Sequence, residues 1–455
     1  MKIIVAGSGK VGEFLCKDLS TEGNDITLIE KDLKILERVL SLCDIKGIEG
    51  NGADPRILED AGVKYTDIFM GVTHSDEVNI ISSVIAKKMG AKLAIARVRN
   101  PEYASRMEFI SSALEIDIMI NPEREAAAFM MKNLEFPNAL AVETFSDNKV
   151  NLVKLLVPEG TYLDGLKLSE FKINYFSDIL VCIVERGESV YVPTGNFILK
   201  ANDKIYVTGT KSNLFEFYRS VGQKIEKIKS VFITGGGRIA YYLIGLLIEK
   251  KLEIKVIEPD FAIARKLSEA YGENIEVIYG NASDKEFLDE EGISKYDSCI
   301  SLSDVDNENM VISMYANKLG IKKIMTRIDD TGLLSILGLV GLQTIITPKQ
   351  LIADKIIKIA RSKIDSRSGN IETLYRLSEN RVEAIEFKIN ENSKILNTPL
   401  KDLNLKKDIL ILYLIRNKQI IFPNGSTELK ANDSVIVITT QKFLDEIDQI
   451  SIINR

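Results

Sequence analysis

Two short glycine-rich stretches carry the clearest chemical signal in this sequence of 455 residues. The first places glycines at positions 7, 9 and 12, directly after the apolar run 2–6. A loop of this spacing between a buried strand and a helix lets the backbone approach a pyrophosphate, and the helix end attracts negative charge. The spacing therefore predicts a nucleotide-binding loop made of Gly7, Ser8, Gly9, Lys10, Val11 and Gly12.

An acidic residue follows this loop at the distance that nucleotide binding requires. Glu30 ends the apolar segment 26–29 and stands 18 positions after Gly12, close to the ~20 that is typical. A carboxylate there accepts hydrogen bonds from both ribose hydroxyls of an adenosine and repels a 2′-phosphate, which disfavours NADP. NAD, NADH, ATP and ADP all carry such a ribose, so Glu30 does not rank them. The alternative is a doubly wound domain whose loop is vestigial and empty.

Further polar residues follow the next predicted strands of the same segment. Strands are predicted at 44–49, 67–72 and 93–97, and ligands of doubly wound sheets lie beyond the carboxyl ends of the strands. The residues expected at that edge are Asn51, Gly52, Thr73, His74 and Arg97. We interpret Arg97 as a phosphate clamp, with a surface salt bridge as the alternative.

The whole pattern returns in the second half of the chain. Gly235 stands 228 positions after Gly7, and Glu258 stands 228 positions after Glu30. The second predicted site consists of Gly235, Gly236, Gly237, Arg238, Ile239, Ala240, Glu258, Asn281, Ala282, Ser303 and Arg327. Ala240 replaces the third glycine, which the fingerprint tolerates. We expect a working second site, with scope for a different affinity or base preference.

His74 is the only histidine, and this limits the chemistry open to the chain. A two-histidine metal site is impossible, and no motif supports a magnesium site made of carboxylates, so we predict no metal. We interpret His74 as a rim residue beside the nucleotide or as a solvated turn. A catalytic role is disfavoured because Asp304 takes its place in the second half. No catalytic residue is predicted.

A small module follows each glycine-loop segment. Short strands come close together after each large pattern, without a glycine loop. A helix at 123–134 is apolar around most of its circumference, so its own domain or a neighbouring subunit should cover it. The predicted fold is α/β, with two doubly wound Rossmann-like parallel-sheet domains, each followed by a small α+β domain. The predicted domains are 1–136, 139–222, 229–361 and 372–455, with linkers at 223–230 and 361–370.

Composition excludes several classes of partner. The net charge is −6 with interleaved signs, so binding to nucleic acid or to an anionic membrane surface has no support. No signal peptide is recognised, and the longest apolar run, 332–346, predicts a buried helix and a strand because it falls short of the ~18 residues of a spanning helix. We therefore expect a cytoplasmic protein that reaches a membrane only through a partner. The four scattered cysteines should be buried.

The chain resembles the TrkA family, the peripheral nucleotide-binding subunits of bacterial Trk potassium uptake systems. The resemblance rests on the first glycine fingerprint with Glu30, on the segments 50–54 and 73–79, on Arg97, and above all on the tandem arrangement. Its units look like domains that regulate potassium conductance (RCK domains). Two departures are Ala240 and the asparagines at 51 and 281, where the family often has aspartate.

The resemblance implies a regulatory subunit that gates a membrane potassium transporter, a TrkH-like partner, from the inner face of the membrane. It implies NAD or NADH, or ATP or ADP, as ligand, and in some relatives cyclic di-AMP in the small domains. A homotetramer would build a ring of eight large domains, joined by helices that follow Pro122 and Pro348.

Two other readings compete with a transporter subunit. An NAD-dependent dehydrogenase needs a proton donor or acceptor beside the nicotinamide, and the small modules offer no concentrated set of such residues. A soluble nucleotide sensor for another partner is the remaining alternative.

Overall fold

The computed structural model describes residues 1–21, 23–145, 150–170, 179–221, 227–330, 332, 342, 344–364, 371–378, 381–441, 444 and 446–452. The chain forms two compact units. One unit combines 1–131 with 229–360, and the other combines 132–228 with 361–455. The two glycine-loop segments thus lie in one compact unit and the two small modules in the other, although the segments alternate along the sequence.

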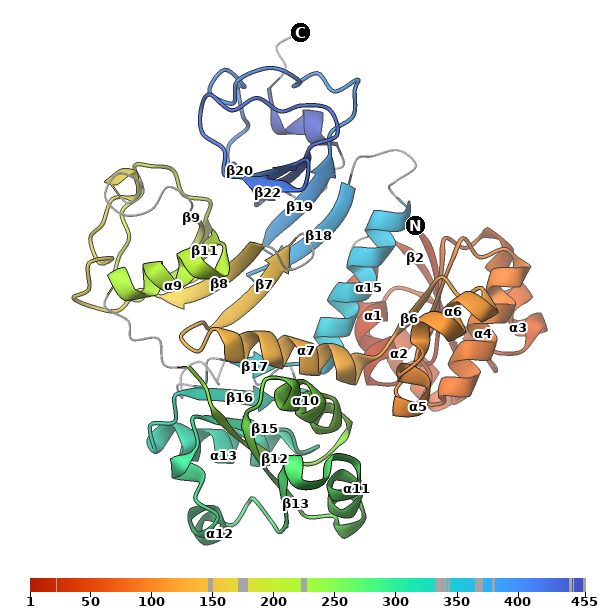
Figure 1. Ribbon diagram of the computed structural model, residues 1–455. Coiled ribbons are helices and arrows are strands. Elements are labelled where there is room, and N and C mark those ends of the chain that lie inside the picture. Colours follow the sequence, from red (N-terminus) through yellow and green to blue (C-terminus); the bar gives the residue numbers. More distant parts are fainter. Residues whose placement is uncertain are drawn as a thin grey trace. The chain divides into compact units, whose positions relative to one another are not determined.

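The first large domain is an open parallel sheet whose strands alternate with helices (Figure 1). The strand order is β3-β2-β1-β4-β5-β6. The strands are β1 (Lys2–Ala6), β2 (Asp25–Glu30), β3 (Lys46–Glu49), β4 (Ile68–Gly71), β5 (Leu93–Arg97) and β6 (Ile118–Ile120). The helices are α1 (Lys10–Ser20), α2 (Leu33–Leu40), α3 (Pro55–Asp60), α4 (Asp76–Met89), α5 (Pro101–Ala104), α6 (Met107–Leu114) and α7 (Pro122–Glu135), with the 3-10 turn η1 (Val63–Tyr65).

The second large domain repeats this topology. Its strand order, β14-β13-β12-β15-β16-β17, corresponds strand by strand to that of the first. The strands are β12 (Ser230–Thr234), β13 (Glu253–Glu258), β14 (Glu276–Tyr279), β15 (Ser298–Ser301), β16 (Lys323–Arg327) and β17 (Ile345–Ile346). The helices are α10 (Arg238–Glu249), α11 (Phe261–Tyr271), α12 (Lys285–Glu290), α13 (Asp306–Lys318) and α15 (Pro348–Ile364), with the 3-10 turns η2 (Gly272–Asn274) and η3 (Ile293–Lys295).

Polar caps at the sheet edge explain where the helices begin. Asp32 accepts hydrogen bonds from the backbone of α2, and Asp54 caps α3, whose first residue is Pro55. Ser75 caps α4. Each cap satisfies N–H groups that a helix start leaves without a partner. The caps therefore start these helices beyond the carboxyl ends of β2, β3 and β4, where the predicted site residues lie.

The two small domains are antiparallel sheets of five strands that share a core. Phe145 and Ile183 from the first module are buried together with Tyr413 and Ile436 from the second. The first sheet contains β7 (Ala141–Phe145), β8 (Val150–Leu156), β9 (Leu180–Arg186), β10 (Ser189–Tyr191) and β11 (Lys204–Gly209), followed by α9 (Lys211–Ser220). The second contains β18 (Ile371–Leu377), β19 (Val382–Lys388), β20 (Ile409–Arg416), β21 (Gln419–Ile421) and β22 (Ser434–Thr439), with η6 (Ile447–Ile450).

The structure confirms the predicted fold class and corrects one linker. Helix α15 continues to Ile364, so the expected linker at 361–370 begins as helix. Within the expected linker at 223–230, residues 223–226 lie outside the described residues, as does most of the expected helix and strand at 332–346; strand β17 is described. All four cysteines are buried. Among the described residues, every helix is too short or too polar to cross a lipid bilayer.

Candidate nucleotide-binding sites

The three glycines of the first loop meet three different structural demands. Gly7 has a φ of +103°, and a Cβ there would lie 2.7 Å from the Thr73 Cα. A Cβ on Gly12 would lie 1.9 Å from the Gly7 carbonyl oxygen, whereas no atom of the described residues lies within 4 Å of a Cβ on Gly9. The first and third glycines therefore serve close packing, and the second leaves open space beside the start of α1, where a phosphate would lie.

Glu30 is tied directly to the loop. Its Oε2 accepts hydrogen bonds from the Ser8 backbone N–H at 2.8 Å and from the Ser8 hydroxyl at 2.7 Å, and its Oε1 accepts from the Lys31 N–H at 2.7 Å. Burial opposes ionisation, but these hydrogen bonds outweigh it and lower the pKa of Glu30. The end of β2 therefore carries a stable carboxylate that lies against the glycine loop.

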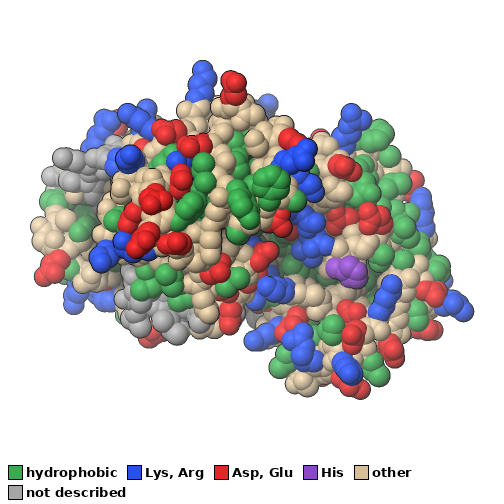
Figure 2. All heavy atoms as spheres, turned by 90° about the horizontal axis from the view of Figure 1, so that it is seen from below, with side chains coloured by type: hydrophobic (Ala, Val, Ile, Leu, Met, Phe, Trp, Pro, Cys, Tyr) green, Lys and Arg blue, Asp and Glu red, His purple; other side chains and the backbone are tan. Residues whose placement is uncertain are grey.

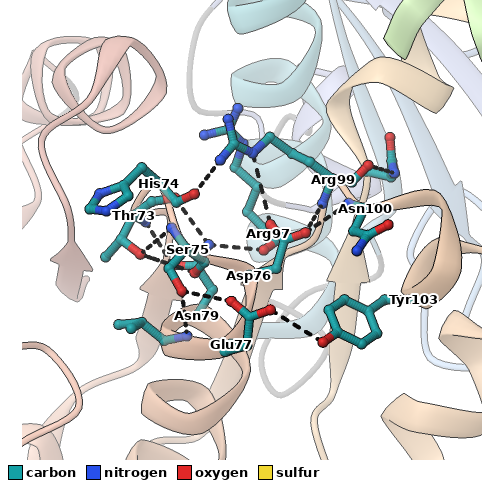
Figure 3. Close-up of polar contacts among 12 residues, drawn as sticks. Thr73, His74, Ser75, Asp76, Glu77, Asn79, Arg97, Arg99, Asn100 and Tyr103 are labelled. Carbon is teal, nitrogen blue, oxygen red and sulfur yellow. Dashed lines mark hydrogen bonds and ion pairs between the residues drawn. The ribbon is translucent and has the colours of Figure 1, made fainter. Parts of the chain in front are cut away.

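Asn79 joins the ends of two neighbouring strands. Its Oδ1 accepts hydrogen bonds from the backbone N–H and the hydroxyl of Thr73, both at 2.7 Å, and its amide donates to the Arg97 carbonyl at 2.9 Å (Figure 3). Asn309 makes the equivalent bonds to Ser303 and Arg327 in the second domain. Thr73 and Arg97 are thus brought together as expected, with a buried amide as the connecting group.

The remaining residues of the first edge lie closer to solvent. His74 is exposed, and Figure 2 shows the single histidine at the surface. Its carbonyl oxygen accepts a hydrogen bond from Arg99 (Figure 3). Asn51 uses its Oδ1 to accept from the Ala53 N–H at 3.2 Å, and a Cβ on Gly52 would meet the Ala6 Cβ at 2.7 Å. Asn51 and Gly52 therefore shape the turn after β3.

Charged groups meet beyond the end of β5 without full pairing. Within the described residues, the buried Arg97 Nε, Arg99 Nε and Glu123 Oε2 atoms have no hydrogen-bond partner. Burial lowers the pKa of Arg97 and raises that of Glu123, and the attraction between them does not restore either. Arg97 is thus a partly buried cation whose Nε donor has no partner among the described residues, and its role as a phosphate clamp stays a prediction.

The second glycine loop keeps the geometry of the first. Gly235 has a φ of +94°, and Glu258 accepts hydrogen bonds from the Gly236 N–H and from the Asp260 N–H. Gly236 stands in the place of Ser8, so this position offers the Glu258 carboxylate a backbone N–H and no side-chain hydroxyl. As in the first loop, a Cβ on Gly237 would meet nothing within 4 Å.

The other predicted residues of the second site take similar positions. Ala240 is fully buried in α10, Ala282 belongs to the apolar core, and the Asn281 Oδ1 accepts from the Ser283 N–H at 2.9 Å. The Ser303 hydroxyl donates to the Val305 carbonyl at 3.2 Å.

Arg327 differs from its counterpart Arg97 because two carboxylates hold it. Its Nη1 donates to Asp304 at 2.6 Å, and its Nη2 donates to Asp329 at 3.1 Å. Burial alone would lower the pKa of Arg327, but Asp329 and Asp304 outweigh burial and raise it. The corresponding residues of the first domain are His74 and Arg99. Two hydrogen-bonded carboxylates therefore neutralise Arg327, whereas the attraction of Glu123 and Asp76 leaves the pKa of the buried Arg97 lowered.

Both glycine loops line one cleft of about 450 Å³ within the first unit. Lys10 of the first loop donates to Asp329 of the second domain at 2.8 Å, and Arg238 of the second loop lies near Arg97 and Glu123. The lining also includes Val11, Arg99, Ile239, Ala240, Asp304 and Arg327. Each loop thus presents a cation to the other domain.

Three residues that line this cleft, Arg99, Glu123 and Asp329, were not predicted from the sequence, and neither was Tyr242, which contacts Arg99. The Tyr242 hydroxyl accepts from the Asn121 amide at 2.9 Å and donates to the Arg99 carbonyl at 3.3 Å, so it joins the two large domains. One signal was available: Arg99 and Asp329 each stand two positions after a predicted site arginine.

Two parallel sheets, each with a glycine loop after its first strand, define a tandem of Rossmann-like α/β domains. The model of the TrkA-N domain matches residues 3–122 and again 231–348, and that of the TrkA-C domain matches 152–222 and 384–450. The chain therefore belongs to the TrkA family.

Relatives cover the chain from end to end. A Trk system potassium uptake protein TrkA homolog of Archaeoglobus fulgidus is 30% identical over 450 residues, which are 99% of this chain and 100% of the relative. The Trk system potassium uptake protein TrkA of Vibrio alginolyticus is 28% identical over 98% of each chain.

Solved structures support the fold. The GsuK RCK domain has a TM-score of 0.62 at 16% identity and covers 97% of this chain and 92% of its own. The GsuK channel bound to NAD has a TM-score of 0.63 at 16% identity and covers 97% of this chain and 77% of that chain. At this identity the likeness concerns the fold alone.

Proposed function

We propose that this chain is a nucleotide-binding regulatory subunit that gates a membrane potassium transporter in response to NAD(H) or an adenine nucleotide. The observation that carries the proposal is the pair of glycine loops, each with a carboxylate bonded to it, that line one cleft. The partner is inferred from the relatives, which are named as Trk system potassium uptake proteins.

The ligand is inferred from the site chemistry. Glu30 and Glu258 would hold an adenosine ribose, and the open space at Gly9 and Gly237 would admit the phosphates. One structure of similar fold is described as the GsuK channel bound to NAD and another as GsuK bound to ADP. NAD, NADH, ATP and ADP are therefore the ligands to test.

The proposed mechanism is linkage between nucleotide binding and the transporter gate. A nucleotide shifts a two-state assembly only by its difference in affinity for the two states. A tenfold preference at one site corresponds to about 1.4 kcal/mol. Several sites acting together can therefore overcome a free-energy difference of a few kcal/mol between the two states of the assembly. We propose a homotetramer whose eight large domains form a ring at the inner face of the membrane, bound to a TrkH-like transporter subunit.

The residue roles belong to this proposal. The two loops would receive pyrophosphate, Glu30 and Glu258 the ribose, and Arg97 the phosphate charge. Asn51, Thr73 and their counterparts would shape the rim. The domain limits that we propose are 1–136, 139–222, 229–361 and 372–455.

Two matched variants allow each site to be tested separately. Gly9 and Gly237 have extended backbones that any residue can adopt, and a Cβ at either position meets no atom within 4 Å in the described part of the chain. Gly9→Leu and Gly237→Leu should therefore fold and fill the space for phosphate. Calorimetry with NADH, NAD, ATP and ADP should detect binding to the natural chain and none to the double variant. Absence of binding to the natural chain would refute the proposal, and sustained NADH oxidation with a small substrate would favour a dehydrogenase.

A further inference from the structure

The second site carries two exposed aromatic rings where the base of a nucleotide would lie. Tyr279 ends β14 and pairs in register with Glu258, and Phe261 begins α11 three positions after Glu258. Phe261 is 64% exposed and Tyr279 is 62% exposed. Their ring centroids are 5.7 Å apart, with the rings nearly perpendicular. We call Phe261 and Tyr279 the aromatic pair.

The first site has no such pair. Leu33 holds the place of Phe261 at the start of α2, and Glu49 pairs in register with Glu30 in the place of Tyr279. The two sites therefore share the loop and the ribose carboxylate and differ in what lies next to them.

The geometry connects the aromatic pair to a base. If the Glu258 carboxylate accepts the ribose hydroxyls, the base attached to that ribose lies at the ends of β13 and β14, beside both rings. An aromatic side chain binds a base through its face, and this contact is worth about 1–3 kcal/mol per base. Such large apolar rings are otherwise mostly buried.

The two sites also differ in the charged residues beside the expected phosphates, and here the first site has the stronger attraction for the ligand. At the first strand end, three cations, Arg97, Arg99 and Arg238, lie near two carboxylates: Glu123, and Asp76, which is 3.8 Å from Arg99. At the second, Arg327 is held by Asp304 and Asp329, and Asp329 also accepts from Lys10. An added phosphate therefore meets an excess of positive charge in the first site and a balanced ion-pair cluster in the second.

We propose that the two sites of one chain select different adenine nucleotides. The first holds its ligand chiefly through phosphate charge and favours the triphosphate. The second holds its ligand chiefly by stacking of the base on the aromatic pair and distinguishes little by phosphate number. This inference rests on the proposed function, because it assigns a ligand class to each proposed site.

The first test compares phosphate series on full-length chains with one site blocked. AMP, ADP and ATP are titrated by calorimetry into Gly237→Leu, which leaves the first site, and into Gly9→Leu, which leaves the second. In the first site affinity should rise from AMP to ATP by about tenfold more than in the second, the order of magnitude that a charge-assisted phosphate contact supplies.

The second test exchanges the base-end residues between the repeats. In the Gly9→Leu chain, Phe261→Leu with Tyr279→Glu should weaken ADP binding about tenfold, the loss expected for base stacking. In the Gly237→Leu chain, Leu33→Phe with Glu49→Tyr should strengthen it. All four positions lie at the surface or at its edge, and thermal unfolding checks that each variant folds.

Each outcome decides a separate question. If neither single-site chain binds any adenine nucleotide, the proposed function and this inference both fail. If both chains bind with the same phosphate preference and the exchanges leave affinity unchanged, only the inference fails. A change in particle mass by light scattering without a change in affinity would assign the aromatic pair to a subunit contact and overturn the inference.

Discussion

Replacement of Glu30 by alanine removes the carboxylate that we expect to hold the ribose, and so tests the proposed nucleotide site. The Glu30 carboxylate accepts two hydrogen bonds from Ser8, at 2.7 and 2.8 Å, and it lies where a ribose would bind. The Glu30→Ala change is made in the Gly237→Leu chain, so that only the first site contributes to the measured heat.

The magnitude follows from the hydrogen bonds that the carboxylate makes. A hydrogen bond to a charged group contributes about 1.5–3 kcal/mol. Loss of one ribose bond of this strength weakens binding by roughly 10- to 150-fold. Loss of the acceptor for the buried Ser8 N–H lowers the stability of the fold instead, by about 1–3 kcal/mol, because it leaves a buried donor unsatisfied in the free and in the bound chain. Glu30→Gln keeps an acceptor without the charge, so its effect should lie between that of alanine and no change.

The assay is calorimetric titration with NADH and ATP. The matched control is Asp25→Ala at the amino end of the same strand, where Asp25 pairs with Lys46 at 3.0 Å in solvent. This surface change should alter affinity by no more than about twofold. If Glu30→Ala folds and binds as tightly as the control, Glu30 does not hold the ribose, and the proposed geometry of the site is wrong.

Three further predictions concern stability. Burial lowers the pKa of Lys323 to about 7. Between about pH 7 and the ordinary lysine pKa of about 10.4, the unfolded state therefore binds more protons than the folded state. The free energy of unfolding should rise with pH across that window in denaturant titrations, and Lys323→Met should abolish the rise. Ser378→Ala removes the hydrogen bond to the Glu185 carboxylate at 2.5 Å in the shared core of the small domains and should cost about 1.5–3 kcal/mol in urea unfolding; no loss would show that this bond is replaced. Arg186→Met leaves Asp203, which is 1% exposed, without its bidentate partner and should cost about 3 kcal/mol, whereas a midpoint equal to that of the natural chain would contradict the assigned pairing.

Local sequence patterns predicted the two large domains well because the motifs that specify these domains lie within short stretches of the chain. The glycine spacing, the acidic end of β2 and Pro55 at the start of α3 all act within a few residues of the structure that they specify. The repeat that places Gly235 in the position of Gly7 predicted the same topology for the second half, and the matching strand orders confirm this prediction.

Contacts between the halves were beyond such patterns. Tyr242 joins the large domains through one hydroxyl, and Glu123 lies beside arginines from two domains. These pairings depend on how two folded domains pack, and residue spacing does not encode that packing. For the same reason, residue spacing did not predict that the compact units combine domains that are distant in sequence.

The contrast between Arg97 and Arg327 shows where sequence and structure complement each other. Repeat alignment identified both arginines and noted Asp304 opposite His74. The structure shows that Asp304 and Asp329 both hold the Arg327 guanidinium and raise its pKa, whereas burial lowers the pKa of Arg97. A repeated residue type can thus have different electrostatics in its two copies.

The most direct test of the central claim is potassium flux through the partner transporter. Rubidium uptake is measured in vesicles that contain the transporter and either the natural chain or the Gly9→Leu, Gly237→Leu double variant, with and without NADH or ATP. Nucleotide should change the flux with the natural chain and leave it unchanged with the double variant. A flux that does not respond to any nucleotide with the natural chain, although the chain binds both the nucleotide and the transporter, would contradict the account.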